Sequence, residues 1–147
     1  MNAEEEHIGI LYNVSYGGFQ ISQKALEEYN KRNLLINPTE ESIINSCCDG
    51  WIERTDTLLC QIYKELGREF NGDHSKIKLK YILKRYENHY IITDYDGKEE
   101  ISINYATYAL DEIKKVLDKV EITNDEKINI IRDMYYINMH NEYSSKS

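Results

Sequence analysis

The chain has 147 residues, of which 41% are apolar and 30% are charged, and its formal net charge is −8. This length suffices for one compact domain with a core, so we expect a single domain over residues 1–147. The acidic balance excludes a broad interface with duplex nucleic acid, which needs many cations on one face.

The cysteines and the absence of a long apolar run predict a cytoplasmic protein. Cys47, Cys48 and Cys60 are odd in number and form no CxxC pair, so we expect a reducing compartment and no structural zinc site. No apolar run approaches the roughly 20 residues that span a bilayer. We expect no cofactor, no metal and no membrane partner.

The first segment predicts a strand, a tight turn and a helix. Residues 8–14 are apolar and partly β-branched, a turn follows at Gly17-Gly18, and Ser22 can cap a helix running to about Arg32. Glycines allow backbone N–H groups to approach a ligand, and the first turn of a helix attracts phosphate. The junction is therefore a candidate anion site. Alternatively, the glycines only supply the angles that the turn needs.

Two further helices are expected before the next strand. One begins near Thr39 and ends at Gly50, and the other covers Thr57 to Phe70, where apolar residues recur at helical spacing. Arg54 precedes the second helix. It is expected to form a solvent-exposed ion pair, or to contribute to an anion site.

From Lys76 the period changes to that of a strand with one buried face and one wet, basic face. The buried face is expected to hold Ile77, Leu79, Tyr81 and Leu83, and the wet face Lys78, Lys80, Ile82 and Lys84. Residues 89–95 and 98–103 flank Asp96-Gly97, a pair typical of a hairpin turn. Together with the first strand, these segments predict a small, mostly antiparallel sheet.

Two amphipathic helices are expected at the C-terminal end. The first covers residues 105–120, and the capping-box pattern of residues 123–126 predicts the start of the second. The predicted fold class is therefore α+β, with a small sheet flanked by helices over residues 8–103 and a helical pair as an extension over residues 104–140.

No catalytic motif is recognisable in the sequence. Asp94 and Asp96 are spaced so that they could hold a divalent cation, but they match no calcium loop and a hairpin tip is the commoner role. The candidate ligand-binding residues are a glycine turn, cations for phosphate and aromatic rings that could stack on a base: Tyr16, Gly17, Gly18, Phe19, Ser22, Arg54, Lys78, Lys80 and Tyr95. Core packing and a solvated strand face are the alternatives.

Several short motifs occur in a familiar order. They are Tyr16-Gly17-Gly18-Phe19 with Ser22, Arg54-x-Asp56, Glu65-Leu66-Gly67 followed by Asn71-Gly72, a lysine-rich strand, and Tyr95-Asp96-Gly97-x-Glu99. The order of these motifs covers about residues 8–103. In this region the chain resembles a family of small proteins from tailed phages and large DNA viruses. That family is similar to the phage anti-CBASS sponges, which sequester cyclic dinucleotides such as 3′3′-cGAMP within a homotetramer and do not hydrolyse them.

The resemblance implies a non-enzymatic viral sponge in the host cytoplasm, with a cyclic nucleotide and other copies of itself as partners. The chain departs from the family at Asp56-Thr57, where Asp-Pro is usual, over residues 33–50, and after residue 105. Two alternatives stay open. One is a viral protein–protein interaction module, and the other is a small nucleotide hydrolase with a metal at Asp94 and Asp96.

Overall fold

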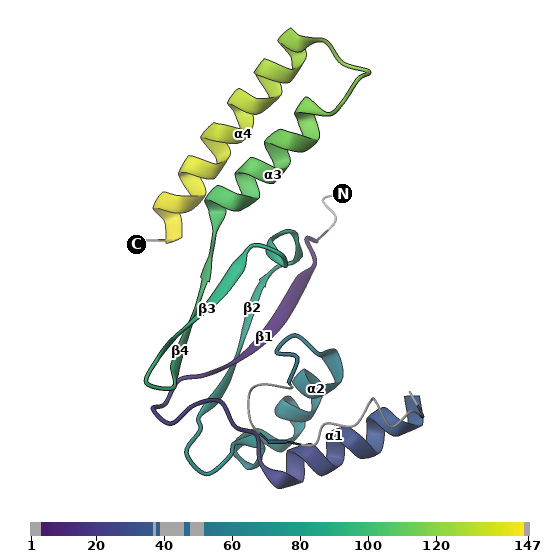
Figure 1. The fold of residues 1–147 in the computed structure, drawn as a ribbon, viewed down its shortest axis with the longest axis vertical. Helices are drawn as coiled ribbons and strands as arrows, with labels where there is room; N and C mark the ends of the chain where they lie inside the picture. Colours follow the sequence, from purple (N-terminus) through teal and green to yellow (C-terminus); the bar gives the residue numbers. More distant parts are fainter. Residues whose placement is uncertain (1–3, 37, 39–45, 48–51, 146–147) are drawn as a thin grey trace. The chain divides into compact units, whose positions relative to one another are not determined.

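The computed structural model of the chain describes residues 4–36, 38, 46–47 and 52–145. Four α-helices, two 3₁₀ helices and four strands occur in this part of the chain, which confirms the α+β class (Figure 1). The elements are β1 (His7–Asn13), α1 (Gln23–Ile36), α2 (Thr57–Leu66), η3 (Gly67–Phe70), β2 (Ile77–Leu83), η4 (Lys84–Tyr86), β3 (Tyr90–Tyr95), β4 (Lys98–Ile103), α3 (Tyr105–Leu117) and α4 (Asn124–Ser145).

The strands form two antiparallel two-stranded sheets instead of the single sheet expected. β1 pairs with β2, from His7 opposite Leu83 to Asn13 opposite Ile77, and β3 pairs with β4. The hairpin turn between β3 and β4 is Asp96-Gly97, with φ of 52° and 85°. Consecutive positive φ values match the twist of a tight hairpin, so the Asp-Gly prediction is confirmed.

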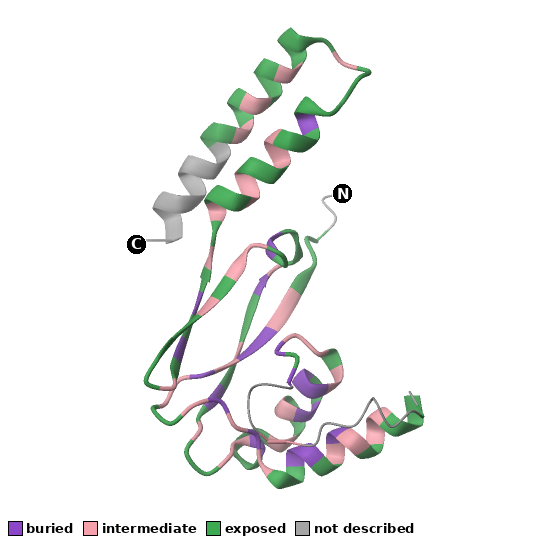
Figure 2. Cartoon of the chain, in the orientation of Figure 1, coloured by how far each residue is buried: buried purple, intermediate pink, exposed green. Residues whose placement is uncertain are grey.

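The main hydrophobic core lies between the β1–β2 sheet and the helices α1 and α2. Figure 2 shows the buried residues on the inner sides of these elements. Removing this apolar surface from water is the main stabilising contribution to the fold. The side chains that are almost completely buried in this cluster are Leu11, Ile21, Ala25, Leu59, Ile62 and Phe70.

Side-chain caps explain where the helices begin. Ser22 Oγ accepts from the Ala25 N–H at 3.1 Å before α1, and Asp56 Oδ1 accepts from the Leu59 N–H at 3.0 Å in α2. At the start of α4, Thr123 and Glu126 exchange side-chain-to-backbone hydrogen bonds of 3.1 and 3.2 Å. These bonds satisfy otherwise unpaired N–H groups, and the predicted capping box is confirmed.

The predicted division of β2 into a buried and a wet face is wrong at two positions. Tyr81 is 51% exposed, whereas Ile82, expected on the wet face, is only 4% exposed. The lysine face is partly covered because β4 lies against it, with Lys80 Nζ donating to the Ile101 carbonyl oxygen at 3.3 Å. Ile10 of β1 and Ile101 of β4 are also buried. The β3–β4 hairpin thus covers apolar side chains on a face of β2 that the strand periodicity predicts to be exposed to solvent.

The helix boundaries also differ from those expected. α1 runs to Ile36 instead of about Arg32, and its last turn exposes Leu35 and Ile36. The expected helix from Thr39 to Gly50 falls mostly outside the described residues. α2 ends at Leu66, where Gly67 with φ of 56° begins the short η3.

Packing divides the chain into two units, Met1–Glu87 with Ile92–Ser102 and Asn88–Ile91 with Ile103–Ser147. The expectation of a single domain stays a prediction. In the second unit α3 and α4 pack side by side, with Val116 buried and Ile131 and Met134 half-buried, as expected for the C-terminal helical pair. No helix in the described ranges has the length and apolarity needed to cross a bilayer.

Candidate functional site

Asn13, the last residue of β1, is fully buried and joins three turns of the chain. Its Nδ2 donates to the carbonyl oxygens of Ser15 and Gly97, each at 2.7 Å. Its Oδ1 accepts from the Lys76 N–H at 2.8 Å. A buried amide is stable when its polar atoms are paired, so Asn13 fixes these turns in place. Sequence reasoning missed this residue.

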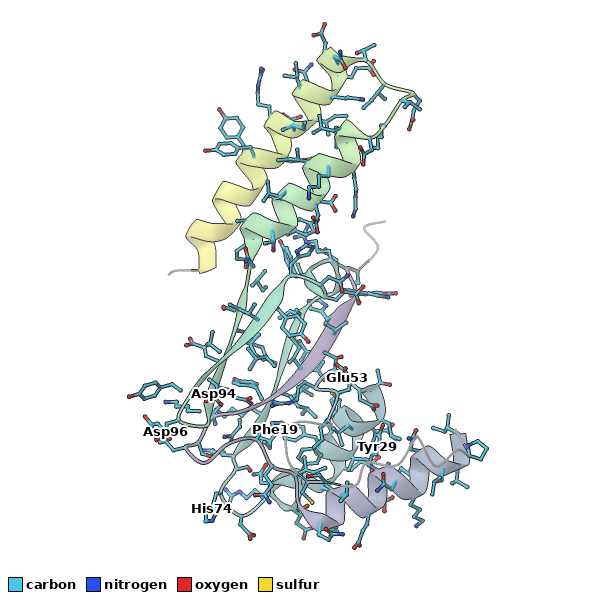
Figure 3. All side chains as sticks on the ribbon, in the orientation of Figure 1. Phe19, Tyr29, Glu53, His74, Asp94 and Asp96 are labelled. Carbon is cyan, nitrogen blue, oxygen red and sulfur yellow. The ribbon has the colours of Figure 1, made fainter. Side chains whose placement is uncertain are left out.

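The glycine turn after β1 packs against the tip of the β3–β4 hairpin, where Figure 3 labels Asp96. The Gly17 N–H donates to the Asp96 carbonyl oxygen at 3.3 Å. A Cβ on Gly97 would lie 2.1 Å from the nitrogen of Gly18, so the two turns touch backbone to backbone. Gly17 and Gly18 have φ of 114° and 93°, angles that other residues rarely adopt. Gly17 and Gly97 therefore serve close packing, and Gly17 donates its N–H inside the fold.

Arg54 forms a buried ion pair with Glu99 of β4. Nη1 and Nη2 donate to the Glu99 carboxylate oxygens at 2.8 and 2.9 Å, and the two side chains are 9% and 4% exposed. The guanidinium carbon lies 3.5 Å from the centroid of the Phe19 ring. The expected solvent-exposed ion pair is wrong, because the hairpin brings a carboxylate from 45 residues away onto Arg54. A phosphate at Arg54 would have to displace Glu99.

Ser22 joins the start of α1 to η3. Its Oγ donates to the Glu69 carbonyl oxygen at 2.5 Å while accepting from Ala25, and its N–H donates to the Phe70 carbonyl oxygen at 2.8 Å. These contacts occupy the hydroxyl and the N–H that a bound phosphate would use. The structure therefore gives Ser22 a capping role.

Lys78 and Lys80 are exposed on β2, opposite Tyr12 and Ile10 in the strand register. Neither lysine lines the hollow beside the hairpin tip.

This open hollow has a volume of about 500 Å³. Tyr16 and Tyr95 line it and are 60% and 78% exposed, so neither ring contributes much to the core. Lys98 Nζ lies 5.7 Å from the centroid of the Tyr16 ring. The structure therefore brings together one aromatic residue from each of two separate motifs, with a cation beside them. The complete lining is Tyr16, Thr93, Asp94, Tyr95, Lys98, Glu99 and Glu100.

Carboxylates make this hollow polar and slightly acidic. Glu99 is paired with Arg54, which leaves Asp94 and Glu100 as negative charges against the positive charge of Lys98. Such a lining suits an aromatic group that carries hydrogen-bond donors, with any anionic part of the ligand held at Lys98.

Sequence reasoning missed Lys98 and Glu100, because strand alternation pairs them on one face but does not show which face is exposed. Side chains alternate along a strand, so Lys98 and Glu100 share one face of β4 and Glu99 takes the other. The buried Arg54–Glu99 pair identifies which face turns inward. Lys98 and Glu100 are accordingly exposed.

Asp94 and Asp96 have structural roles in the hairpin turn. Asp94 Oδ1 accepts from the Gly97 N–H at 3.1 Å, and the Asp96 carbonyl oxygen accepts from Gly17. In the part of the chain that the structure describes, no three His, Cys, Asp or Glu side chains are grouped so that they could hold a metal ion.

The chain matches no protein-family model, no curated protein and no solved structure. The viral resemblance therefore depends on the quoted motifs alone.

Proposed function

We propose that this protein is a viral sponge that binds a cyclic nucleotide immune messenger of the cGAMP kind in the host cytoplasm and holds it uncleaved. The observation that most supports this proposal is the hollow that Tyr16 and Tyr95 share. Both rings are largely exposed to solvent, although large aromatic side chains stabilise a fold mainly when they are buried.

Stacking of bases on tyrosine would supply much of the affinity. A base stacked on an aromatic side chain gains about 1–3 kcal/mol, and a cyclic dinucleotide offers two bases. Tyr16 and Tyr95 lie next to turns that Asn13 and Gly97 hold together. Prior ordering of these turns lowers the entropy lost when the ligand binds.

The polar lining would orient the ligand. Lys98 offers a cation to a phosphate, while Asp94 and Glu100 offer acceptors to the amino groups of a base. A carboxylate close to a phosphate would repel it, so the phosphates are expected at Lys98 and the base edges at the carboxylates. This arrangement favours bases that carry an amino group, such as guanine and adenine.

We also propose that copies associate through the helical pair. Leu110 and Leu117 in α3 lie seven residues apart, as do Ile128 and Tyr135 in α4, and all four are 54–59% exposed. Residues seven apart lie on the same side of a helix, so each of the two helices presents an exposed apolar stripe. Exposed apolar surface of this kind is typical of an interface. Light scattering should give a molar mass that is a multiple of the 17.4 kDa chain mass. The double variant Leu117→Lys with Ile128→Lys should give the mass of a single chain.

Calorimetry against a panel of cyclic di- and trinucleotides, at micromolar protein, tests the sponge. At least one member should bind, and Tyr16→Ala and Tyr95→Ala should each weaken its binding about tenfold. Tyr136→Ala is the matched control, because Tyr136 in α4 is equally exposed at 61% but does not line the hollow. Heating the complex should release intact ligand. Failure of every member to bind, or recovery of a cleaved product, would contradict the proposal.

A protein–protein interaction module is the second candidate, favoured by the same apolar stripes of α3 and α4. It predicts no thermal shift with any nucleotide. It also predicts a partner that co-purifies with the wild-type chain and is lost with the paired lysine substitutions at Leu117 and Ile128.

A further inference from the structure

A second hollow, of about 400 Å³, lies in the first unit beside residues 7–9 of β1 and Tyr81 of β2. The start of α2 and the residues before it complete its wall. It shares no lining residue with the hollow at the hairpin tip. Its volume lies within the range of about 300–1,000 Å³ usual for small-molecule sites.

Tyr81 forms one wall of this second hollow because its strand partner has no side chain. In the register of β1 and β2 it lies directly opposite Gly9. A Cβ on Gly9 would lie 3.4 Å from Cε1 of the Tyr81 ring, so the ring extends over the glycine. The ring is nevertheless 51% exposed, which leaves aromatic surface available for stacking.

Lys64 of α2 places a cation beside this ring. Its Nζ lies 5.3 Å from the Tyr81 ring centroid, and a hydrogen bond with the Tyr81 side chain raises the pKa of Lys64 above its usual value. Among the described residues Lys64 has no carboxylate within ion-pair distance, unlike Lys24 and Lys84. The neighbouring Glu65 is bound by Arg32 at 2.7 Å. The charge of Lys64 is therefore available to a ligand.

Besides Lys64, the residues that line this hollow in the described part of the chain include no lysine, arginine, aspartate or glutamate. Cys60 is buried, and burial raises the pKa of its thiol to about 11, so that it stays neutral. Thr55, Thr57 and Gln61 add hydroxyl and amide groups. None of the described residues that line this hollow carries a carboxylate, whereas three carboxylates line the first hollow. The second hollow is therefore less acidic than the first, which favours the binding of an anion beside Lys64.

We infer that the second hollow binds a planar aromatic molecule with one anionic group, with the ring against Tyr81 and the anion at Lys64. A carboxylate, sulfonate or phosphate accepts hydrogen bonds from an ammonium group, and removal from water strengthens such charged bonds. This site is separate from the proposed cyclic nucleotide site and does not depend on it.

Titration of the ¹⁵N-labelled full chain, followed by amide chemical shifts, tests this inference with four probes. Naphthalene-1-sulfonate and guanosine 5′-monophosphate each carry a ring and an anion, guanosine carries only the ring, and inorganic phosphate only the anion. At least one of the first two should shift Gly9 and Gln61 and bind at least tenfold tighter than guanosine and phosphate. Shifts with the monophosphate alone identify a nucleotide ligand, and shifts with both probes identify aromatic anions in general.

Substitutions at Lys64 and Tyr81 complete the test. Lys64→Gln and Tyr81→Leu should each weaken probe binding about tenfold, as expected for loss of a charge-assisted hydrogen bond or of a stacking surface. Lys31→Gln is the matched control, because Lys31 is exposed on α1 and lines neither hollow. An unchanged affinity in a folded Lys64→Gln protein, or no binding of either aromatic anion, overturns the inference. Neither result affects the cyclic nucleotide proposal, which is tested at Tyr16 and Tyr95.

Discussion

Replacing Glu99 with Gln should destabilise the fold strongly, because it leaves Arg54 charged and buried without its carboxylate. The two side chains are 9% and 4% exposed and are joined by hydrogen bonds of 2.8 and 2.9 Å. Glu99 Oε1 also accepts from the Asn13 N–H at 2.8 Å. Removing one partner of such a pair costs about 3–5 kcal/mol, a large part of the roughly 5–15 kcal/mol that stabilises a typical protein.

Urea unfolding followed by circular dichroism measures this loss. Glu6→Gln is the matched control, because Glu6 pairs with Lys84 at 2.7 Å and both side chains are more than half exposed. This substitution should leave the midpoint of urea unfolding nearly unchanged. Arg54→Met combined with Glu99→Met should recover much of the stability, since no charge then stays unpaired. A loss below about 1 kcal/mol for Glu99→Gln would refute the reasoning.

Three further predictions concern a glycine, a tyrosine and a cysteine. Gly97→Ala should destabilise more than Gly67→Ala in urea unfolding, since both have positive φ but only at Gly97 would a Cβ meet backbone, 2.1 Å away. Burial, then the hydrogen bond to Asp56, raises the pKa of Tyr29 to about 12, so absorbance at about 295 nm should show one tyrosine ionising late. Between pH of about 10 and 12 the Tyr29 side chain is ionised in the unfolded chain but still protonated in the folded one, so the unfolded chain binds fewer protons. The contribution of Tyr29 to the free energy of unfolding should therefore be lost as the pH rises through that window. Ionisation of every tyrosine near pH of about 10 would contradict this prediction. Cys60, with its thiol pKa raised to about 11 by burial, should react slowly with a disulfide reagent at neutral pH until urea is added, and immediate reaction in the native protein would be the contrary result.

The features that the sequence predicted correctly depend on local chemistry. Ser22 and the Thr123–Glu126 capping box bond to N–H groups within a few residues, and Asp96-Gly97 determines its own turn. Such signals depend little on the rest of the chain.

The features that the sequence did not reveal depend on contacts between distant segments. Glu99 reaches Arg54 across 45 residues, and Asn13 reaches Gly97 across 84. The hairpin covers part of the lysine face of β2, so Ile82 is buried against the expected alternation. The pattern of residues along one strand cannot show which distant segment packs on it.

The ligand-binding role of the candidate residues stays a prediction. The structure places Tyr16 and Tyr95 at one hollow, whereas Arg54 and Ser22 have partners inside the fold. Glycine N–H groups and an arginine can serve packing as well as anion binding, and only their partners distinguish these roles.

Native mass spectrometry of the protein mixed with 3′3′-cGAMP and related cyclic nucleotides shows whether the chain holds such a ligand and whether the ligand stays intact. A mass increase equal to an intact ligand is expected for the wild-type chain and for Tyr136→Ala, and a smaller ligand-bound fraction is expected for Tyr95→Ala at the same ligand concentration. A wild-type spectrum without any ligand, or one whose bound species has the mass of a linear, hydrolysed nucleotide, would contradict the sponge proposal.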